Sequence, residues 1–260
     1  MGKLQGSWVW YELMTHDPEG AKAFYEAMVG WSMTTGHGEN TDYGFISSPD
    51  GEMTGGMLRL SGEMTDHGAR PCWLGYIGVD DVDAAIVAIG AKGGKCLMPA
   101  RDVEMAGRFA MVADPGGAPF YVMTPLPPPG GGESTAFSPT LPGRCSWNEL
   151  LAANATDATD FYTALFGWSL PEPMDMGAMG KYQFIAHDGV QVGAIMQKSE
   201  QVPVAGWSHY FRVPSIAASQ AEVTARGGQV VTEPMQVPTG DWIIQGIDPQ
   251  GAFFSLVGGK

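Results

Sequence analysis

Two long stretches of the chain, VWYELMTHDPEGAKAFYEAMVGW from position 9 and CSWNELLAANATDATDFYTALFGW from position 145, carry the same residue pattern. The matches share one offset of 137 residues and pair Trp10 with Trp147, Glu12 with Glu149, and Gly30-Trp31 with Gly167-Trp168. Further matches follow at an offset of 134, between ADPGGAPFYVM and IDPQGAFFSLV among others. A repeat of this length predicts two homologous halves, each folding as the same unit.

A proline- and glycine-rich stretch, TPLPPPGGGESTAFSPTLPGRC, separates the halves. Its composition cannot sustain the interior of a helix or a sheet, which predicts a linker. The expected organisation is a first domain over residues 1–124, a linker over 125–143 and a second domain over 144–260.

A shorter repeat lies inside each half. Four helix starts each precede a glycine by 13 residues, at Asp17, Asp81, Asn154 and Ser215, with the glycines at Gly30, Gly94, Gly167 and Gly228. Asp, Asn and Ser favour the N-cap, and glycine favours the left-handed residue that ends a helix. Strand-like runs stand on either side, so the sequence predicts four modules of strand, helix and three strands.

The pattern of a strand, a helix opening like DPEGAKAFYEAMVGW and a closing strand after DPGGAPF resembles the vicinal oxygen chelate superfamily. That superfamily includes glyoxalase I, bleomycin-resistance proteins and extradiol dioxygenases, and the chain is similar to its two-domain glyoxalase-like members. The resemblance implies an α+β fold of four βαβββ modules, paired into two glyoxalase-like domains. Each domain would have a curved mixed sheet around a concave cavity, with the helices outside.

The resemblance also implies a divalent metal held by histidine, glutamine or glutamate on the first and last strands of paired modules. The matching positions here are Trp10, Leu74, Tyr121, Trp147, Ser208 and Ser255. These residues are poor ligands, and a metal site needs at least three good donors. Strand alternation puts His209, beside one of these positions, on the outer face with Phe211. We therefore predict no metal site and no cofactor, although a divalent metal stays an alternative.

Glu12 and Glu149 each interrupt an apolar strand, two residues after Trp10 and Trp147. The period of two places each glutamate on the inner face. Burial raises the pKa of a carboxyl group, which prepares it for general acid or base catalysis. In the alternative, purely structural interpretation each glutamate bonds to backbone, to a tyrosine or to Arg212.

Aromatic and polar residues are expected to line the two cavities, and the same residues would otherwise belong to the core. The first cavity would take Trp10, Tyr76 and Tyr121, and the second would take Trp147, Tyr210 and Arg212. Such walls suit a small aromatic or planar organic molecule. Because Arg212 and His209 replace Gly78 and Gly75, the second cavity is expected to be the more polar.

Three functions fit these residues. The first is an enzyme of lyase or isomerase type in which Glu12 or Glu149 transfers a proton. The second is a metal-free protein that sequesters a drug or metabolite, as bleomycin-resistance proteins do, and here acidity and aromatic walls would favour a cation. The third is a metal-dependent lyase or dioxygenase.

Charge and hydropathy limit the possible partners. A formal charge of −14 without a Lys/Arg cluster argues against nucleic acid. The chain has no apolar run of about 20 residues and no signal peptide, which predicts a cytoplasmic protein with no membrane partner. Three cysteines without a CxxC pair indicate reduced, structural thiols. Either a monomer or a homodimer fits the sequence.

Overall fold

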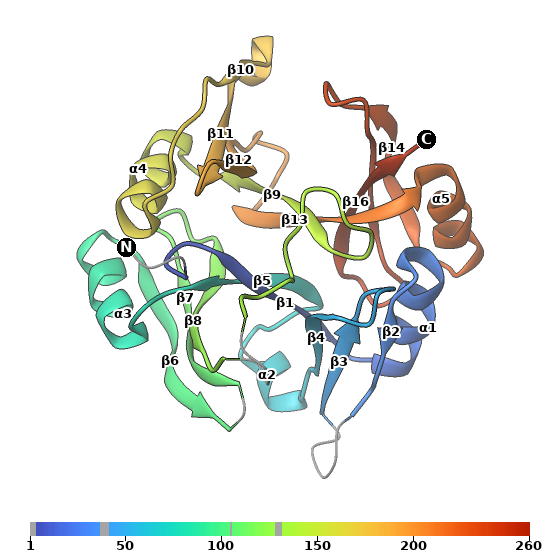
Figure 1. Cartoon of the computed structure of the whole chain (residues 1–260), viewed down its shortest axis with the longest axis horizontal. Helices are drawn as coiled ribbons and strands as arrows, with labels where there is room; N and C mark the ends of the chain where they lie inside the picture. Colours follow the sequence, from blue (N-terminus) through green and yellow to red (C-terminus); the bar gives the residue numbers. More distant parts are fainter. Residues whose placement is uncertain (1–3, 37–41, 105, 128–131) are drawn as a thin grey trace. The chain divides into compact units, whose positions relative to one another are not determined.

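The structure is a computed structural model that describes residues 4–36, 42–104, 106–127 and 132–260. The predicted order of strand, helix and three strands occurs four times (Figure 1). The first half contains β1 (Trp8–Thr15), α1 (Pro18–Val29), β2 (Ser32–Met33), β3 (Tyr43–Ser47), β4 (Met53–Arg59), α2 (Gly62–Asp66), β5 (Cys72–Gly78), α3 (Val82–Ala91), β6 (Lys95–Val103), β7 (Gly107–Ala113) and β8 (Pro119–Pro125). The second half contains β9 (Cys145–Ala152), α4 (Ala155–Phe166), β10 (Met174–Asp175), the 3₁₀ helix η1 (Gly177–Met179), β11 (Lys181–His187), β12 (Val190–Gln197), β13 (Gly206–Ser215), α5 (Ile216–Ala225), β14 (Gln229–Gln236), β15 (Trp242–Ile247) and β16 (Phe253–Gly259).

Each half contributes one sheet of eight strands. The strand orders are β2-β3-β4-β1-β5-β8-β7-β6 and β10-β11-β12-β9-β13-β16-β15-β14, so the two halves have the same topology. Within each module the first and last strands pair in parallel, as β1 does with β4 and β13 with β16. The hairpin pairs, such as β15 with β16, are antiparallel. The predicted α+β fold of paired βαβββ modules in mixed sheets is confirmed.

The helix starts are also as predicted. The side chains of Asp17, Asp81, Asn154 and Ser215 each accept a hydrogen bond from a backbone N–H in the first turn of their helix. Gly30 and Gly167 end α1 and α4 in the left-handed conformation.

The prediction for the two other glycines is wrong by one residue. The positive φ angles belong to Gly93 and Gly227, because α3 and α5 end at caps Lys92 and Arg226. Gly94 and Gly228 are needed for packing instead. A Cβ on Gly94 would lie 2.6 Å from Ile89 Cγ2, and one on Gly228 would lie 2.9 Å from Phe24 Cε2.

The chain forms two compact units, each built from one module of each half. Unit 1 comprises Met1–Val9, Gly75–Ser134 and Trp147–Trp207, and unit 2 comprises Trp10–Leu74, Thr135–Ser146 and Ser208–Lys260. In unit 1, α3 lies beside α4, and in unit 2, α1 lies beside α5 (Figure 1). The domain bounds expected from the sequence stay a prediction.

Each unit has an aromatic core. In unit 2, Trp73 lies between Tyr25, Trp31 and Phe211, with ring centroids 4.6–5.6 Å apart. In unit 1, Trp168 stacks on Tyr162 at 5.6 Å, and Trp207 packs edge-on against Tyr162 at 5.2 Å. These rings anchor the strands that carry the candidate site residues.

The stretch between β8 and β9 is tied down in unit 2. Its described residues form no helix or strand, apart from an isolated bridge between Phe137 and Cys145. Arg144 is buried and forms an ion pair with Asp50, at 2.7 Å between Nη2 and Oδ2. The Trp31 indole donates a hydrogen bond to the Gly143 carbonyl at 2.7 Å. Within the described ranges, no helix has the length and hydropathy that crossing a membrane requires.

Candidate functional site

A chain of hydrogen bonds links Trp147, Tyr182 and Glu149 in unit 1. The indole Nε1 of Trp147 donates to the Tyr182 hydroxyl at 2.8 Å, and this hydroxyl donates to Glu149 Oε2 at 2.6 Å. Trp147 and Glu149 lie two residues apart on β9, and Tyr182 lies on β11. All three side chains are half-buried, so part of this cluster is open to solvent.

Small and aromatic neighbours shape the space around Glu149. Its cross-strand partner on β12 is Ala194, and Ala194 in turn pairs with Phe184 on β11. The short alanine side chain between them leaves room for the tyrosine hydroxyl to reach the carboxylate. Phe184 packs edge-on against Trp147 at 6.0 Å and against Tyr182 at 5.5 Å. The carboxylate therefore lies beside an aromatic wall.

Burial, followed by the negative charge of Glu149, raises the pKa of Tyr182 far above its usual range. Tyr182 consequently keeps its proton and acts as a donor at any ordinary pH. In this pair, Glu149 is the group that can accept a further proton.

The first half repeats this arrangement in unit 2. The Trp10 indole donates to the Tyr43 hydroxyl at 3.0 Å, and Phe45 packs edge-on against Trp10 at 6.5 Å. Glu12 pairs across the sheet with Gly56, and the Tyr43 hydroxyl occupies the place that a Gly56 side chain would take. Glu12 is only 3% exposed, so its carboxylate is less accessible than that of Glu149.

Cys72 on β5 lies close enough to Glu12 for the carboxylate to affect its titration. Burial and then the charge of Glu12 raise the pKa of the Cys72 thiol to about 12. The thiol is therefore protonated at neutral pH, which fits the expected reduced, unreactive cysteine. All three cysteines are free.

Tyr76 and Tyr121 come together in unit 1. They are cross-strand partners on β5 and β8, and their rings stack with centroids 4.2 Å apart and planes 11° apart. Phe109 packs edge-on against both rings at 5.8 Å. These aromatics form one buried cluster on a single face of the sheet.

Tyr210 and Arg212 lie on β13 in unit 2. The Gln245 amide donates to the Tyr210 hydroxyl at 2.8 Å. Arg212 forms a two-pronged ion pair with Asp241, at 2.7 and 3.2 Å, and also bonds Ser146. The Asp241 carboxylate offsets the charge of Arg212, so this strand presents polar groups without an isolated cation.

His209 packs on the face opposite Tyr210. Its ring lies edge-on to Tyr11 at 5.0 Å, and Phe211 meets the same tyrosine at 5.9 Å. This is the outer placement that strand alternation predicts. Burial lowers the pKa of His209 to about 3, so the ring is neutral at physiological pH.

The residues at the metal-ligand positions do not suit a metal. The indoles of Trp10 and Trp147 can only donate, and they do so to Tyr43 and Tyr182. The remaining positions hold Leu74, Tyr121, Ser208 and Ser255, without an imidazole or carboxylate among them. Elsewhere in the described ranges, no three His, Cys, Asp or Glu side chains gather as metal ligands would.

Sequence reasoning missed Tyr43 and Tyr182, which bond to the tryptophans. A signal was present, since YGF and YQF occupy the same strand in the two halves, each with a phenylalanine two residues after the tyrosine. It also missed Gln245 and Asp241, the partners of Tyr210 and Arg212. Their pairing depends on the order of strands in the sheet, which a single sequence does not reveal.

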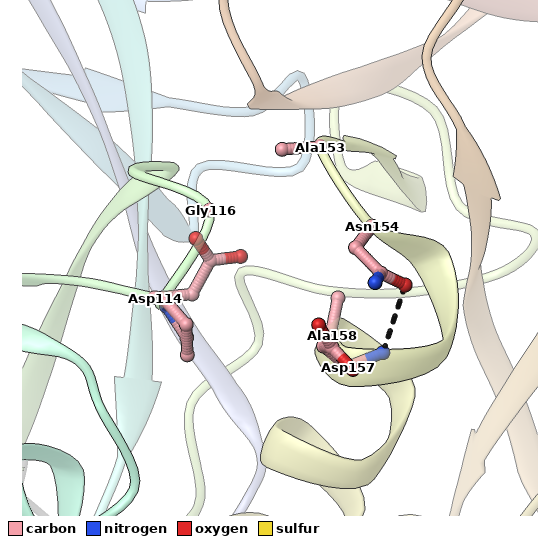
Figure 2. A pocket seen from close by; sticks show the side chains of 7 residues that line it. Asp114, Gly116, Ala153, Asn154, Asp157 and Ala158 are labelled. Atoms are coloured by element: carbon pink, nitrogen blue, oxygen red, sulfur yellow. Dashed lines mark hydrogen bonds between the residues drawn. The ribbon is translucent and has the colours of Figure 1, made fainter.

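A separate cavity of about 170 Å³ lies in unit 1, between the turn at Asp114 and the start of α4 (Figure 2). Its most buried polar group, the Asp114 carboxylate, accepts hydrogen bonds from the Ala118 N–H at 2.9 Å and from Tyr162 at 3.3 Å. Asn154 caps the helix through the N–H of Asp157. Since these groups serve the turn and the helix, we assign them no ligand.

Comparison with known proteins agrees with this fold. A family model described as "Glyoxalase/Bleomycin resistance protein/Dioxygenase superfamily" matches residues 8–122 and 145–256. A protein of Mycobacterium tuberculosis named "Putative glyoxylase CFP32" is 32% identical, over 97% of this chain and 95% of its own length. The "Anthracycline biosynthesis protein DnrV" of Streptomyces peucetius is 30% identical, over 97% and 93%.

Solved structures share the fold at low sequence identity. The Mn(II)-bound glyoxalase from Novosphingobium aromaticivorans has a TM-score of 0.64 at 17% identity, covering 98% of this chain and 82% of its own. The 2,3-dioxygenase LapB from Pseudomonas sp. KL28 has a TM-score of 0.66 at 14% identity, covering 98% and 93%. With the family model matching both halves, the chain belongs to the glyoxalase/bleomycin resistance protein/dioxygenase superfamily.

Proposed function

We propose that the protein binds a small planar organic molecule beside Trp147 and transfers a proton on it through Glu149, in a lyase or isomerase reaction. The observation that carries this proposal is the 2.6 Å hydrogen bond from Tyr182 to Glu149 in a half-buried cluster. It holds one carboxylate oxygen in a fixed orientation next to an aromatic wall. A general base needs such positioning, together with access to the ligand.

The proposed step is a proton transfer from an acidic C–H of the ligand to the Glu149 carboxylate. The electron pair of that bond stays on the ligand as an enolate, and the proton returns to a neighbouring atom or leaves with a departing group. Tyr182 keeps its own proton and, by donating to Glu149, orients the base. The residues at the family's metal positions are not donors of the usual type, so we propose no metal-bound step.

Solvent exchange tests this proposal without knowledge of the natural substrate. The probe is 1-tetralone, a fused aromatic ketone with acidic C–H groups next to its carbonyl. In D₂O, the wild-type protein should accelerate loss of these proton signals in the NMR spectrum. Glu149→Gln should lower the accelerated rate by about 100-fold or more. Glu172→Gln, at an exposed acid of the same half, should leave it unchanged. An exchange rate that Glu149→Gln leaves intact would refute the proposal.

A second candidate function is sequestration of a planar aromatic cation. The acidic charge of the chain and the Trp147–Phe184 wall favour it. The similarity to a protein named for anthracycline biosynthesis also points to a fused-ring ligand. Proflavine, a planar aromatic cation, should then bind stoichiometrically, more weakly at high salt, and be recovered unchanged. Binding without any tetralone exchange would favour this candidate over the enzyme.

The metal-dependent alternative has its own test. Elemental analysis of the purified protein, with a chelator-treated control, should give no stoichiometric divalent metal if the proposal is right. A bound metal whose removal abolishes tetralone exchange would favour a metal-dependent lyase or dioxygenase instead.

A further inference from the structure

A row of four polar residues crosses four adjacent strands in unit 2. Tyr210 on β13 pairs with Ser255 on β16, Ser255 pairs with Gln245 on β15, and Gln245 pairs with Thr232 on β14. Directly paired residues project from the same face of a sheet, so the four side chains stand side by side. We call this row the polar strip.

Unit 1 has a row of two tyrosines and two methionines at the equivalent positions. The pairs Tyr76–Tyr121, Tyr121–Met111 and Met111–Met98 have the same register, each residue standing 134 positions before its counterpart in the polar strip. Tyrosine replaces Ser255, and methionine replaces both Gln245 and Thr232. The same sheet position therefore has two different chemistries in the two units.

Hydrogen bonds fix the side chains of the polar strip. Thr232 donates to Gln245 Oε1 at 3.0 Å, and Gln245 Nε2 donates to the Tyr210 hydroxyl at 2.8 Å. Neighbouring strands lie about 5 Å apart, so the bond from Gln245 to Tyr210 spans the strand between them, above Ser255. An amide nitrogen has two N–H groups, and Tyr210 takes one of them.

Ser255 is the unexplained member of the polar strip. It is fully buried, and its hydroxyl has no hydrogen-bond partner among the residues that the structure describes. A buried hydroxyl left unsatisfied costs about 1–3 kcal/mol. Its hydrogen bond can instead come from a ligand, and the donor groups of Ser255 and Gln245 suit an oxygen acceptor. The nearby cation Arg212 is paired with Asp241, which favours an uncharged acceptor over a carboxylate.

We propose that Ser255, with Gln245 and Tyr210, forms a subsite for the carbonyl oxygen of an uncharged planar ketone or quinone. In the equivalent row of unit 1, Tyr121 takes the place of Ser255 and Met111 the place of Gln245, so this row lacks the serine and amide donors and is not expected to share this preference. The subsite goes beyond the proton transfer proposed for Glu149, which lies in the other unit.

Two probes that differ only at the carbonyl test the subsite. They are 9-fluorenone and its hydrocarbon analogue fluorene, with binding measured by isothermal titration calorimetry. The wild-type protein should bind fluorenone about tenfold more tightly than fluorene, as one hydrogen bond predicts. Ser255→Ala should bring this ratio to about one. The matched variant Ser219→Ala, which removes a buried hydroxyl of unit 2 that already donates to the Met28 carbonyl, should keep it.

Thermal stability separates a ligand-binding serine from a structural one. Because Ser255→Ala removes a hydroxyl without a partner, its Tm without ligand should equal or exceed that of the wild type. The inference would be overturned if Ser255→Ala had a lower Tm or kept the wild-type ratio of probe affinities. It would also be overturned if the wild-type protein bound both probes equally or bound neither. Glu149→Gln leaves the polar strip intact, so this variant should lose tetralone exchange and still prefer fluorenone to fluorene. The proton transfer and the subsite can therefore fail independently of each other.

Discussion

The hydroxyl of Tyr25 on α1 lies 2.9 Å from Asp248 Oδ2, although 223 residues separate them in the chain. The same hydroxyl accepts a hydrogen bond from the Trp73 indole at 3.0 Å. Unit 1 repeats the arrangement, with Tyr162 between Asp114 and Trp207. In each unit a helix tyrosine from one module thus fixes the closing turn of another module, and all of these polar groups are buried.

Tyr25→Phe should lower the free energy of unfolding by about 3 kcal/mol, because it leaves Asp248 and Trp73 each short of a buried partner. Urea denaturation measures this loss. Tyr162→Phe should cost less, since its bond to Asp114 is longer, at 3.3 Å. Tyr182→Phe, at a half-buried position that water can reach, is the control and should cost least. Equal losses in all three variants would contradict this account.

The buried carboxyl of Asp248 should make stability fall as pH rises. Burial raises its pKa, although hydrogen bonds from the turn N–H groups oppose the shift. Above the unfolded pKa of about 3.9, the folded state then holds more protons than the unfolded state, and this excess disappears only above the raised pKa. Stability should therefore decrease with pH across that window. Urea titrations from pH 3 to 7 should show a smaller decrease in Asp248→Asn, and identical slopes would argue against a raised pKa.

His209 should act in the opposite direction. Burial lowers its pKa to about 3, so the unfolded state binds more protons between about pH 3 and pH 6.5. Stability therefore rises with pH in this range. At pH 5, uptake of a proton by this histidine in the unfolded state should lower the free energy of unfolding by about 2 kcal/mol. His209→Gln cannot take up the proton and should lose this part of the slope in urea titrations. Parallel curves for the two proteins would contradict the prediction.

The sequence predicts the topology well because its signals are local and repeated. The caps at Asp17 and Asn154 and the left-handed glycines Gly30 and Gly167 each depend on a few neighbouring residues. The wrong glycine at α3 has a local cause too. Gly93 and Gly94 are adjacent, and spacing alone does not say which one takes the positive φ and which one packs against Ile89.

The site is predictable only in part. Strand alternation predicts that Trp147 and Glu149 share one face of their strand, but it does not supply Tyr182, whose strand reaches Glu149 through β12. The contact between Tyr25 and Asp248 depends on packing of the first module against the fourth within unit 2. Such long-range pairings follow from three-dimensional packing, so a single sequence without homologues leaves them open.

Gly56 tests whether the Tyr43 hydroxyl needs the space beside Glu12. A Cβ at this position would collide with that hydroxyl, so Gly56→Ala should displace Tyr43 and break its hydrogen bond with Trp10. We expect a loss of about 1–2 kcal/mol in unfolding free energy, together with a change in the near-ultraviolet circular dichroism of Trp10.

Tyr43→Phe removes the colliding atom, so the double variant should be more stable than the sum of the two single losses predicts. Ala194→Gly, at the equivalent position of the second half, is the matched control, because Ala194 already carries a Cβ beside Glu149. This control should leave the hydrogen bond between Tyr182 and Glu149 in place. It should lower the free energy of unfolding by about 0.5–1 kcal/mol through the backbone entropy of a strand glycine, in addition to the lost contacts of the alanine methyl group. If the losses of unfolding free energy in Gly56→Ala and Tyr43→Phe simply add in the double variant, the two positions do not compete for space. The glycine would then be required only for the backbone conformation.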